Sequence, residues 1–265
     1  VGNPHATRRA SVGNRRRAWQ RWRLVAIDVM YTLETMWAHR SVCEIVRLSI
    51  SGFDYRIDPL AGCAYRDGWF AVLAGNAMAE IVTLADAVSQ LIADGDCVAM
   101  EGFTHLIPHA AGHEVIRQRK RNLRLVRMTP DLIYDQLIGA GCAAALRFSW
   151  GGNPGVGSLH RLRDAVEHAW PQLLQIREHS HADMANAYVA GASGLPFAVL
   201  RGYVGSDLPR VNDTIKFMQC PYTGQTLATS PAVNPDVTVI HAQQADRRGN
   251  VLLWGILGVQ KEAAL

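Results

Sequence analysis

From Thr83 onward, short apolar runs alternate with longer segments in which apolar positions recur at helical spacing. Short continuous apolar runs are typical of buried parallel strands, and the longer periodic segments are typical of amphipathic helices. We expect strands at CVAM, LRLVRM, LRFSW, LLQIREHS, FAVLRG, VTVIHA and VLLWG. We expect helices over residues 83–95, 108–120, 130–141, 159–170 and 181–194. This alternation predicts an α/β fold, with an open, mainly parallel sheet flanked by helices.

The carboxyl ends of these strands are the places where a site is expected, because ligands of parallel sheets bind just beyond them. Polar or glycine-rich segments follow four of the predicted strands, at residues 101, 151–158, 179–181 and 242–250.

Residues 1–77 do not continue this alternation. They contain 11 of the 27 basic residues, all of them arginine, and four of the seven tryptophans. Such a segment can be a basic arm for nucleic acid or membrane, an arginine-rich targeting peptide, or a translated leader. We favour the leader, because MAEIVTLADAV at Met78 has the pattern of a natural start. We therefore expect 1–77 to be non-native or disordered and 78–265 to form one domain.

The composition describes a globular protein, with 49% hydrophobic and 19% charged residues. No apolar stretch approaches the roughly 18 residues of a membrane span. The five cysteines lie far apart and form no CxxC pair. We interpret them as reduced thiols of a cytoplasmic protein, and we expect no membrane association.

Three histidines at a spacing of four, His105, His109 and His113, suggest a metal site at first. A pair at i and i+4 on one helix can bind zinc, but the sequence H-A-A-G-H-E lacks the HExxH glutamate. Pro108 also separates His105 from the predicted helix. We therefore expect no metal.

The segment GGNPGVGS, residues 151–158, is rich in glycine and precedes a predicted helix. Glycines allow close backbone approach, and free N–H groups at a helix start suit an anionic or carbonyl ligand. The spacing fits neither the dinucleotide fingerprint nor a P-loop. Ser180 precedes another predicted helix, and a helix cap and a substrate contact are equally good interpretations of it.

Glu101 ends an apolar run and is followed by Gly102 and Phe103. A partly desolvated carboxyl group would have a raised pKa and would serve as a base or nucleophile. A surface glutamate at a turn explains the pattern equally well, so the residues alone leave both interpretations open.

Several segments carry a resemblance to a known family. They resemble the A (alpha) subunits of family I CoA-transferases, the glutaconate CoA-transferase group: EGFTHLIP, FSWGGNPGVGSLHRLRDAVEHAWP, EHSHADMANAYVAGASGLPF, CPYTG, DVTVIHAQQADRRGNV and GVQKEA. Within that group, the likeness is closest to the A-type subunits of the bacterial steroid-ring CoA hydrolase of cholesterol degradation. The resemblance covers about residues 78–265. The A-type subunits of the family continue beyond GVQKEA, so we expect the domain to be C-terminally incomplete.

The resemblance implies an acyl-CoA thioester substrate, no permanently bound cofactor, and a B (beta) subunit partner in an α2β2 assembly. In ordinary members, the thioester is attacked by a glutamate of the B subunit. Glu101 occupies a glycine position of the family's Gly-Gly-Phe turn, where the hydrolase has its essential glutamate. The resemblance therefore assigns to Glu101 the role of base in hydrolytic opening of a cyclic β-keto acyl-CoA.

The expected substrate contacts are Gly102, Phe103, Thr104, His105, Gly151, Gly152, Asn153 and Ser180. Oxyanion donors are expected from the backbone N–H groups of 151–153 and from the side chains of Asn153 and His105. A true CoA-transferase acting on glutaconate or a 3-oxoacid is the alternative. A second alternative is a non-catalytic module whose basic arm binds nucleic acid, although no nucleic-acid partner is expected under the main interpretation.

Overall fold

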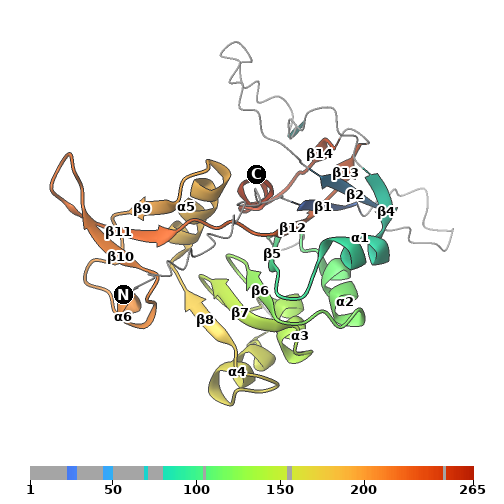
Figure 1. The fold of residues 1–265 in the computed structure, drawn as a ribbon, viewed down its shortest axis with the longest axis horizontal. Coiled ribbons are helices and arrows are strands. Elements are labelled where there is room, and N and C mark those ends of the chain that lie inside the picture. Colours follow the sequence, from blue (N-terminus) through green and yellow to red (C-terminus); the bar gives the residue numbers. More distant parts are fainter. Residues whose placement is uncertain are drawn as a thin grey trace, which may run out of the picture.

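The structure is a computed structural model of the chain (Figure 1). It describes residues 80–103, 106–153, 157–246 and 249–265, together with the backbone of 23–28, 44–49 and 69–70.

An eight-stranded sheet forms the centre of the molecule, in the order β4-β2-β1-β12-β5-β6-β7-β8. Five neighbouring strands run parallel: β12 (Val237–Ala242), β5 (Cys97–Glu101), β6 (Leu123–Val126), β7 (Ala143–Phe148) and β8 (Gln175–Glu178). β1 (Arg23–Asp28) extends the parallel part beside β12, whereas β2 (Glu44–Ser49) and β4 (Glu80–Thr83) pair antiparallel. The expected open, mainly parallel α/β sheet is confirmed.

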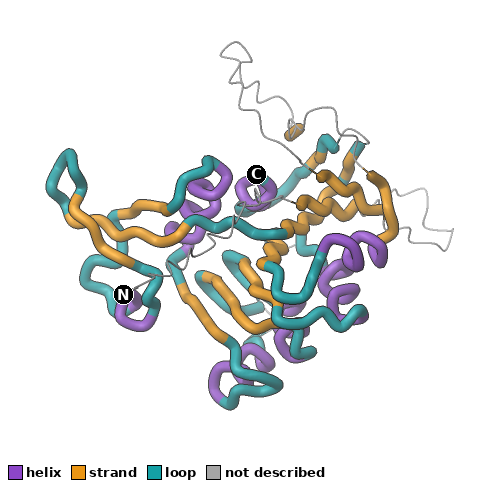
Figure 2. Tube along the Cα trace, viewed as in Figure 1, coloured by secondary structure: helices purple, strands orange, loops and turns teal. Residues whose placement is uncertain are grey.

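Helices cover both faces of this sheet (Figure 2). One face packs against α1 (Leu84–Leu91), α2 (His109–Arg117), α3 (Leu132–Gly139) and α4 (His160–Glu167). The other face packs against α5 (His181–Ala192) and the short α7 (Gln260–Ala264). Side chains of a strand alternate between the faces, so Val98 and Met100 of β5 join the first core and Ala99 joins the second. Short apolar strands buried on both faces explain why continuous apolar runs predicted them.

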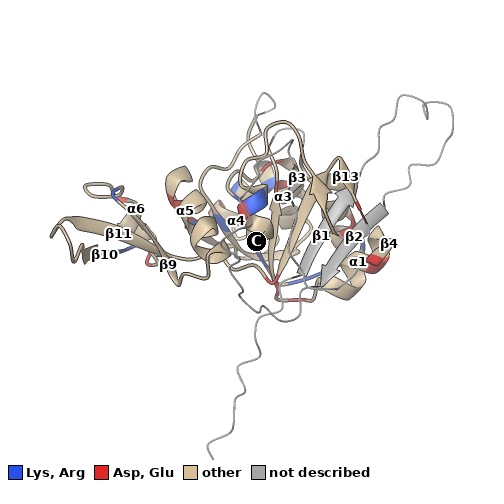
Figure 3. Cartoon of the chain, turned by 90° about the horizontal axis from the view of Figure 1, so that it is seen from above, with Lys and Arg blue, Asp and Glu red and all other residues tan. Residues whose placement is uncertain are grey.

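A three-stranded antiparallel sheet projects from the body as an arm, as Figures 1 and 3 show. It consists of β9 (Phe197–Leu200), β10 (Lys216–Gln219) and β11 (Thr226–Pro231), with α6 (Leu208–Val211) between β9 and β10. A small third sheet contains β13 (Gln244–Ala245), β14 (Val251–Leu252) and β3 (Trp69–Phe70). β10, β11 and β13 were not predicted from the sequence.

The first predicted helix shows how element ends differ from expectation. Thr83 caps α1 as expected, with its hydroxyl accepting from the Asp86 N–H at 3.1 Å. The helix ends at Leu91, however, one turn before the predicted stop at Gly95. Asp96 accepts from the Ala93 N–H at 2.8 Å, and Gly95 adopts a φ of +87°. A side-chain-stabilised turn therefore replaces the last helical turn.

No helix in the described part of the chain is long and apolar enough to cross a membrane. β1, β2 and β3 fall within residues 1–77. That this segment is a non-native leader stays a prediction.

Candidate functional site

The carboxyl end of β5 lies where the strand order reverses. From β5 the chain adds β6, β7 and β8 on one side, and β12 occupies the other side. Open α/β sheets bind their ligands at such a switch point. Glu101 is the last residue of β5 and pairs with Ile240 of β12. The structure thus places the main candidate residue at the edge where a ligand is expected.

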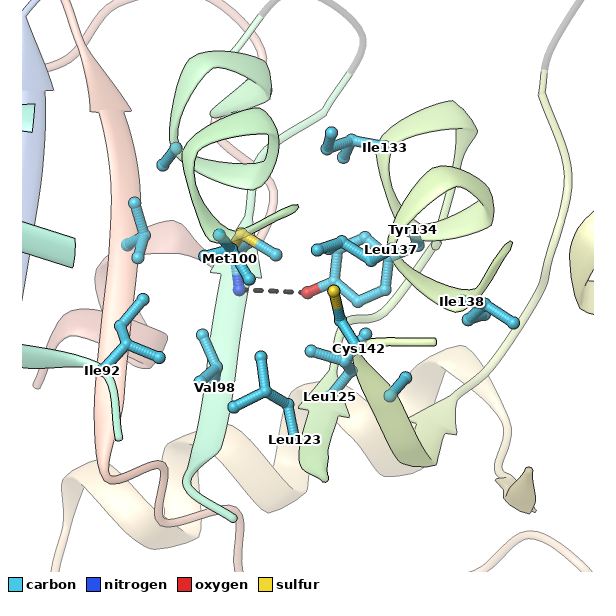
Figure 4. Packing of buried hydrophobic residues seen from close by; sticks show 14 of the residues in the cluster. Ile92, Val98, Met100, Leu123, Leu125, Ile133, Tyr134, Leu137, Ile138 and Cys142 are labelled. Carbon is cyan, nitrogen blue, oxygen red and sulfur yellow. Dashed lines mark hydrogen bonds between the residues drawn. The ribbon is translucent and has the colours of Figure 1, made fainter. Parts of the chain in front are cut away.

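β5 continues for two residues beyond its ladder with β6. Their ladder stops with Ala99 opposite Val126, whereas the ladder between β5 and β12 continues to Glu101. The buried hydroxyl of Tyr134 bridges the backbone groups beyond the ladder: it accepts from the Met100 N–H at 3.1 Å (Figure 4) and donates to the Val126 carbonyl at 2.9 Å. Buried backbone groups require such partners. Tyr134 therefore supports the separated ends of the two strands.

The carboxyl group of Glu101 lies on the α5 face of the sheet, the same face as Ala99 two residues earlier. Glu101 is only 2% exposed. Its Oε1 atom accepts from the Tyr188 hydroxyl at 2.6 Å and from the Met128 N–H at 2.8 Å. Burial raises the pKa of Glu101, while the charge of Arg127 and the hydrogen bonds oppose the rise. The sequence left open whether Glu101 is a desolvated carboxyl group or a surface glutamate at a turn. The structure shows a buried carboxyl group.

Arg127 is a buried cation directly after β6, with 1% of its surface exposed. Its Nη2 atom donates to the Gly102 carbonyl at 2.9 Å and pairs with Asp131 at 3.0 Å. Asp131 also caps α3 by accepting from the Ile133 N–H at 3.2 Å. Arg127 was not among the site residues predicted from the sequence. An arginine at the end of the apolar run LRLV was the signal that could have indicated it.

Glycine is required at position 102 because the backbone of Leu106 lies too close for a side chain. A Cβ atom at this position would lie 1.7 Å from the Leu106 carbonyl oxygen. Phe103, which follows, is 39% exposed and available for contact. Thr104 and His105 lie outside the described residues, so their roles stay predictions.

Hydrogen bonds to the turn after β6 hold the start of the glycine-rich loop. The Met128 carbonyl accepts from the Ser149 N–H at 3.0 Å and from the Ser149 hydroxyl at 2.6 Å. The Gly152 N–H donates to the Pro130 carbonyl at 3.2 Å. A Cβ atom on Gly152 would approach the Trp150 ring to 2.5 Å. The loop is therefore shaped by its neighbours, and glycine is needed for its close packing.

The backbone donors expected over 151–153 are only partly free. The N–H of Gly152 is used within the protein, and that of Asn153 faces the Gly157 carbonyl at 3.4 Å. Among the described residues, the Gly151 N–H has no such partner. The expected set of backbone donors therefore narrows to Gly151.

A pocket of about 300 Å³ adjoins the same loop. It lies on the α4 face of the sheet and is lined by Phe148, Gly151, Ser158, Leu159, Leu162, Arg163, Val166, Glu167 and Ile176. Glu101 points to the opposite, α5 face. Gly151 therefore lines a pocket, and Glu101 is connected to the same loop through Met128. The carboxyl group of Glu101 does not point into that pocket.

Ser180 forms the N-cap of α5, with its hydroxyl accepting from the Asp183 N–H at 3.1 Å. Its own N–H donates to the Tyr203 hydroxyl at 2.6 Å. The capping interpretation is confirmed, and a substrate contact of Ser180 stays a prediction.

A buried polar cluster next to this cap was not predicted. His179 Nδ1 lies 2.7 Å from an Asp183 carboxyl oxygen, which also accepts from the Tyr203 hydroxyl at 2.8 Å. The Ser230 hydroxyl binds the other oxygen of Asp183. On the far side of the imidazole, Asn212 Nδ2 lies 3.2 Å from His179 Nε2. The i, i+4 pair of His179 and Asp183 was its only local signal. The cluster joins β8 and α5 to the arm.

The histidines of α2 form no metal site with other described residues. The rings of His109 and His113 lie 6.5 Å apart, and His113 Nε2 contacts Gln136 Oε1 at 2.8 Å. No group of three or more potential ligand residues gathers anywhere in the described ranges.

Comparison with known proteins identifies the family to which the chain belongs. Residues 81–264 match the family model for coenzyme A transferase. The chain therefore belongs to the coenzyme A transferase family, and it is of the A (alpha) type found in family I.

Among its relatives is the A-type chain of the 3-oxoadipate CoA-transferase of Pseudomonas knackmussii, which is 75% identical over 71% of this chain and 67% of that protein. The A-type chain of the glutaconate CoA-transferase of Acidaminococcus fermentans is 30% identical over 67% of this chain. The crystal structure of that glutaconate enzyme superposes with a TM-score of 0.63 at 28% identity, covering 69% of this chain and 62% of that chain. The chain spans about three fifths to two thirds of the length of these relatives.

The expected steroid-ring function is wrong. The IpdA component of the cholesterol ring-cleaving hydrolase of Rhodococcus jostii is 29% identical over 89 residues, only 31% of this chain. The similarity to the 3-oxoadipate enzyme is far higher and longer. The expectation rested on the EGFTHLIP segment, and one turn does not define a reaction. The role of base in ring opening falls with that function.

Proposed function

We propose that the chain is the A-type component of an enzyme that transfers coenzyme A between 3-oxoadipate and another carboxylic acid. The 75% identity to the corresponding chain of a 3-oxoadipate CoA-transferase carries this proposal. We further propose a B (beta) subunit partner in an α2β2 assembly, a cytoplasmic location, and coenzyme A present only as part of the thioester substrate.

Transfer of this kind begins when a carboxylate attacks the thioester carbonyl, which develops negative charge on its oxygen. We propose that the attacking glutamate belongs to the B subunit, as the resemblance implies. Gly151 lines the pocket beside α4, and its N–H has no backbone partner among the described residues, so we propose that it stabilises that oxygen. Phe103 and the turn around Gly102 follow β5, two strands away from β7 in the sheet, and are proposed as further contacts of the acyl-CoA. These contacts, with those of Thr104, His105, Gly152, Asn153 and Ser180, are proposals for the acyl-CoA site.

The test uses the chain co-purified with its B subunit. Exchange of CoA is measured by mass spectrometry of acyl-CoA products, with several donor thioesters and with 3-oxoadipate, glutaconate and short 3-oxoacids as acceptors. We expect 3-oxoadipyl-CoA to form fastest. Faster transfer to glutaconate would replace the proposed acceptor. Release of free CoA without any acceptor requirement would contradict transfer itself.

A further inference from the structure

We propose that Glu101 is a positioning residue, which holds the start of the glycine-rich loop, residues 149–152, in place as a hydrogen-bond acceptor and exchanges no proton with substrate. The expected effect of Glu101 on activity rests on the proposed function. Its expected effect on the order of the loop rests on the contacts around Met128.

The first link joins the end of β5 to the turn after β6. Glu101 Oε1 accepts from the Met128 N–H at 2.8 Å, just beyond the point where the ladder between the two strands stops at Val126. The carboxyl group therefore replaces the missing strand partner of that N–H. Arg127 adds a second tie between the same two segments, from its Nη2 to the Gly102 carbonyl at 2.9 Å.

The second link joins the same turn to the glycine-rich loop. The carbonyl of Met128 accepts from both the N–H and the hydroxyl of Ser149, and the Trp150 N–H approaches it at 3.3 Å. Two groups of one residue thus connect Glu101, on one strand end, to the two residues that precede Gly151. A shift of Met128 would move the start of the loop, including the proposed Gly151 donor.

The surroundings of Glu101 suit an acceptor better than a base. The hydrogen bonds from Tyr188 and Met128 end on the same atom, Oε1, the Gly102 backbone also hydrogen-bonds the carboxyl group, and the residue is 2% exposed. The fully buried Tyr188 covers the carboxyl group on the α5 face, while the pocket beside Gly151 lies on the α4 face. A proton on its way to substrate would have to cross this packed layer.

Glutamine separates the two roles, because it keeps one acceptor oxygen but has no titrating carboxyl group. The experiment compares Glu101→Gln and Glu101→Leu in the complex with the B subunit. Asp207→Asn is the control, since the Asp207 side chain is 84% exposed beside α6. Two quantities are measured: kcat for CoA transfer over pH, and hydrogen–deuterium exchange in peptides that contain residues 149–152.

We expect Glu101→Gln to keep kcat within about threefold of wild type, with an unchanged pH profile and unchanged exchange. Glu101→Leu should lower kcat by about tenfold to a hundredfold, as misplacement of a site does. It should also speed exchange in 149–152. The control should change neither quantity.

Equal loss of kcat in both variants with unchanged exchange would overturn the proposal and make the carboxyl group a participant in the chemistry. Unchanged kcat and exchange in Glu101→Leu would overturn it as well. If Glu101→Leu does not fold, Ser149→Ala tests the second link, with faster exchange at 150–152 expected and no change contradicting it. If the wild-type complex transfers no CoA, the proposed function fails, while the exchange data still decide whether Glu101 orders the loop.

Discussion

At the scale of single residues, two side chains replace backbone partners where β5 and β6 separate. Tyr134 bridges Met100 and Val126, and Glu101 binds the N–H of Met128. A buried backbone group that loses its hydrogen-bond partner no longer replaces the hydrogen bonds that it made to water in the unfolded state, and this lowers the stability of the fold.

Tyr134→Phe should therefore lower the free energy of unfolding by about 1–3 kcal/mol, because it leaves the Met100 N–H and the Val126 carbonyl unpaired without changing the ring. Urea unfolding of the purified chain measures this. Tyr222→Phe is the matched control, since Tyr222 is 93% exposed, and it should change stability by less than about 0.5 kcal/mol. A loss no larger than that of the control would contradict the bridging role.

Gly102→Ala should destabilise the protein by about 1–3 kcal/mol and reduce CoA transfer, because its Cβ atom would overlap the Leu106 carbonyl. Gly202→Ala serves as control, because its nearest atom is the end of the Leu200 side chain at 3.4 Å. Thermal unfolding and kcat of both variants check this. Wild-type behaviour of Gly102→Ala would show that the turn can relax.

The sequence indicated where Glu101 lies but not what surrounds it. An apolar run followed by Glu-Gly-Phe placed the residue at a strand end, as observed. Its partner Tyr188 is 87 positions away, on α5. Only the packing of α5 on the sheet brings the two together, so no local pattern could reveal the contact.

At the scale of elements, the five parallel strands from β12 to β8 and strand β9 were predictable, whereas β10 and β11 of the arm were not. Strands such as β12 are buried on both faces and form continuous apolar runs in the sequence. β10 is exposed along its whole length and therefore shows no such signal. The start of β7 was missed because its alanines are weak indicators of a strand.

The cluster that joins the arm to the body should make stability depend on pH. Asn212 Oδ1 accepts from the Thr214 N–H, so its Nδ2 faces His179 Nε2 and donates to it. His179 is then neutral, with its Nδ1–H donated to Asp183. Burial lowers the pKa of His179, and the charges of Arg147 and Arg177 lower it further, against the opposing effect of Asp183.

Because the folded state binds this proton less readily than the unfolded state, the stabilisation is present above the unfolded pKa of about 6.5 and is lost as pH falls below it. The free energy of unfolding should decrease from about pH 7 to 5, with a slope of at most about 1.4 kcal/mol per pH unit for one proton. Urea titrations of wild type and His179→Gln test this. An equally steep profile in the variant would show that another group is responsible.

At the scale of the whole molecule, we propose that the chain holds one edge of a site and that the attacking group lies on a partner chain. The sequence resemblance identified the family correctly and the reaction wrongly. Fold and family follow from patterns spread along the chain, whereas the reaction depends on a few contacts and on the partner.

The chain alone should therefore transfer no CoA, and activity should appear only with the B subunit. Size-exclusion chromatography with light scattering should show an α2β2 complex after co-expression. Full activity of the isolated chain would contradict the division of the site between two chains.

The most direct test of the proposed function is acceptor dependence. The complex is incubated with a donor acyl-CoA, with and without 3-oxoadipate, and all CoA species are followed by mass spectrometry. We predict stoichiometric formation of 3-oxoadipyl-CoA, with little free CoA in either reaction. Rapid release of free CoA without 3-oxoadipate, or hydrolysis of a cyclic β-keto acyl-CoA at a comparable rate, would contradict the account.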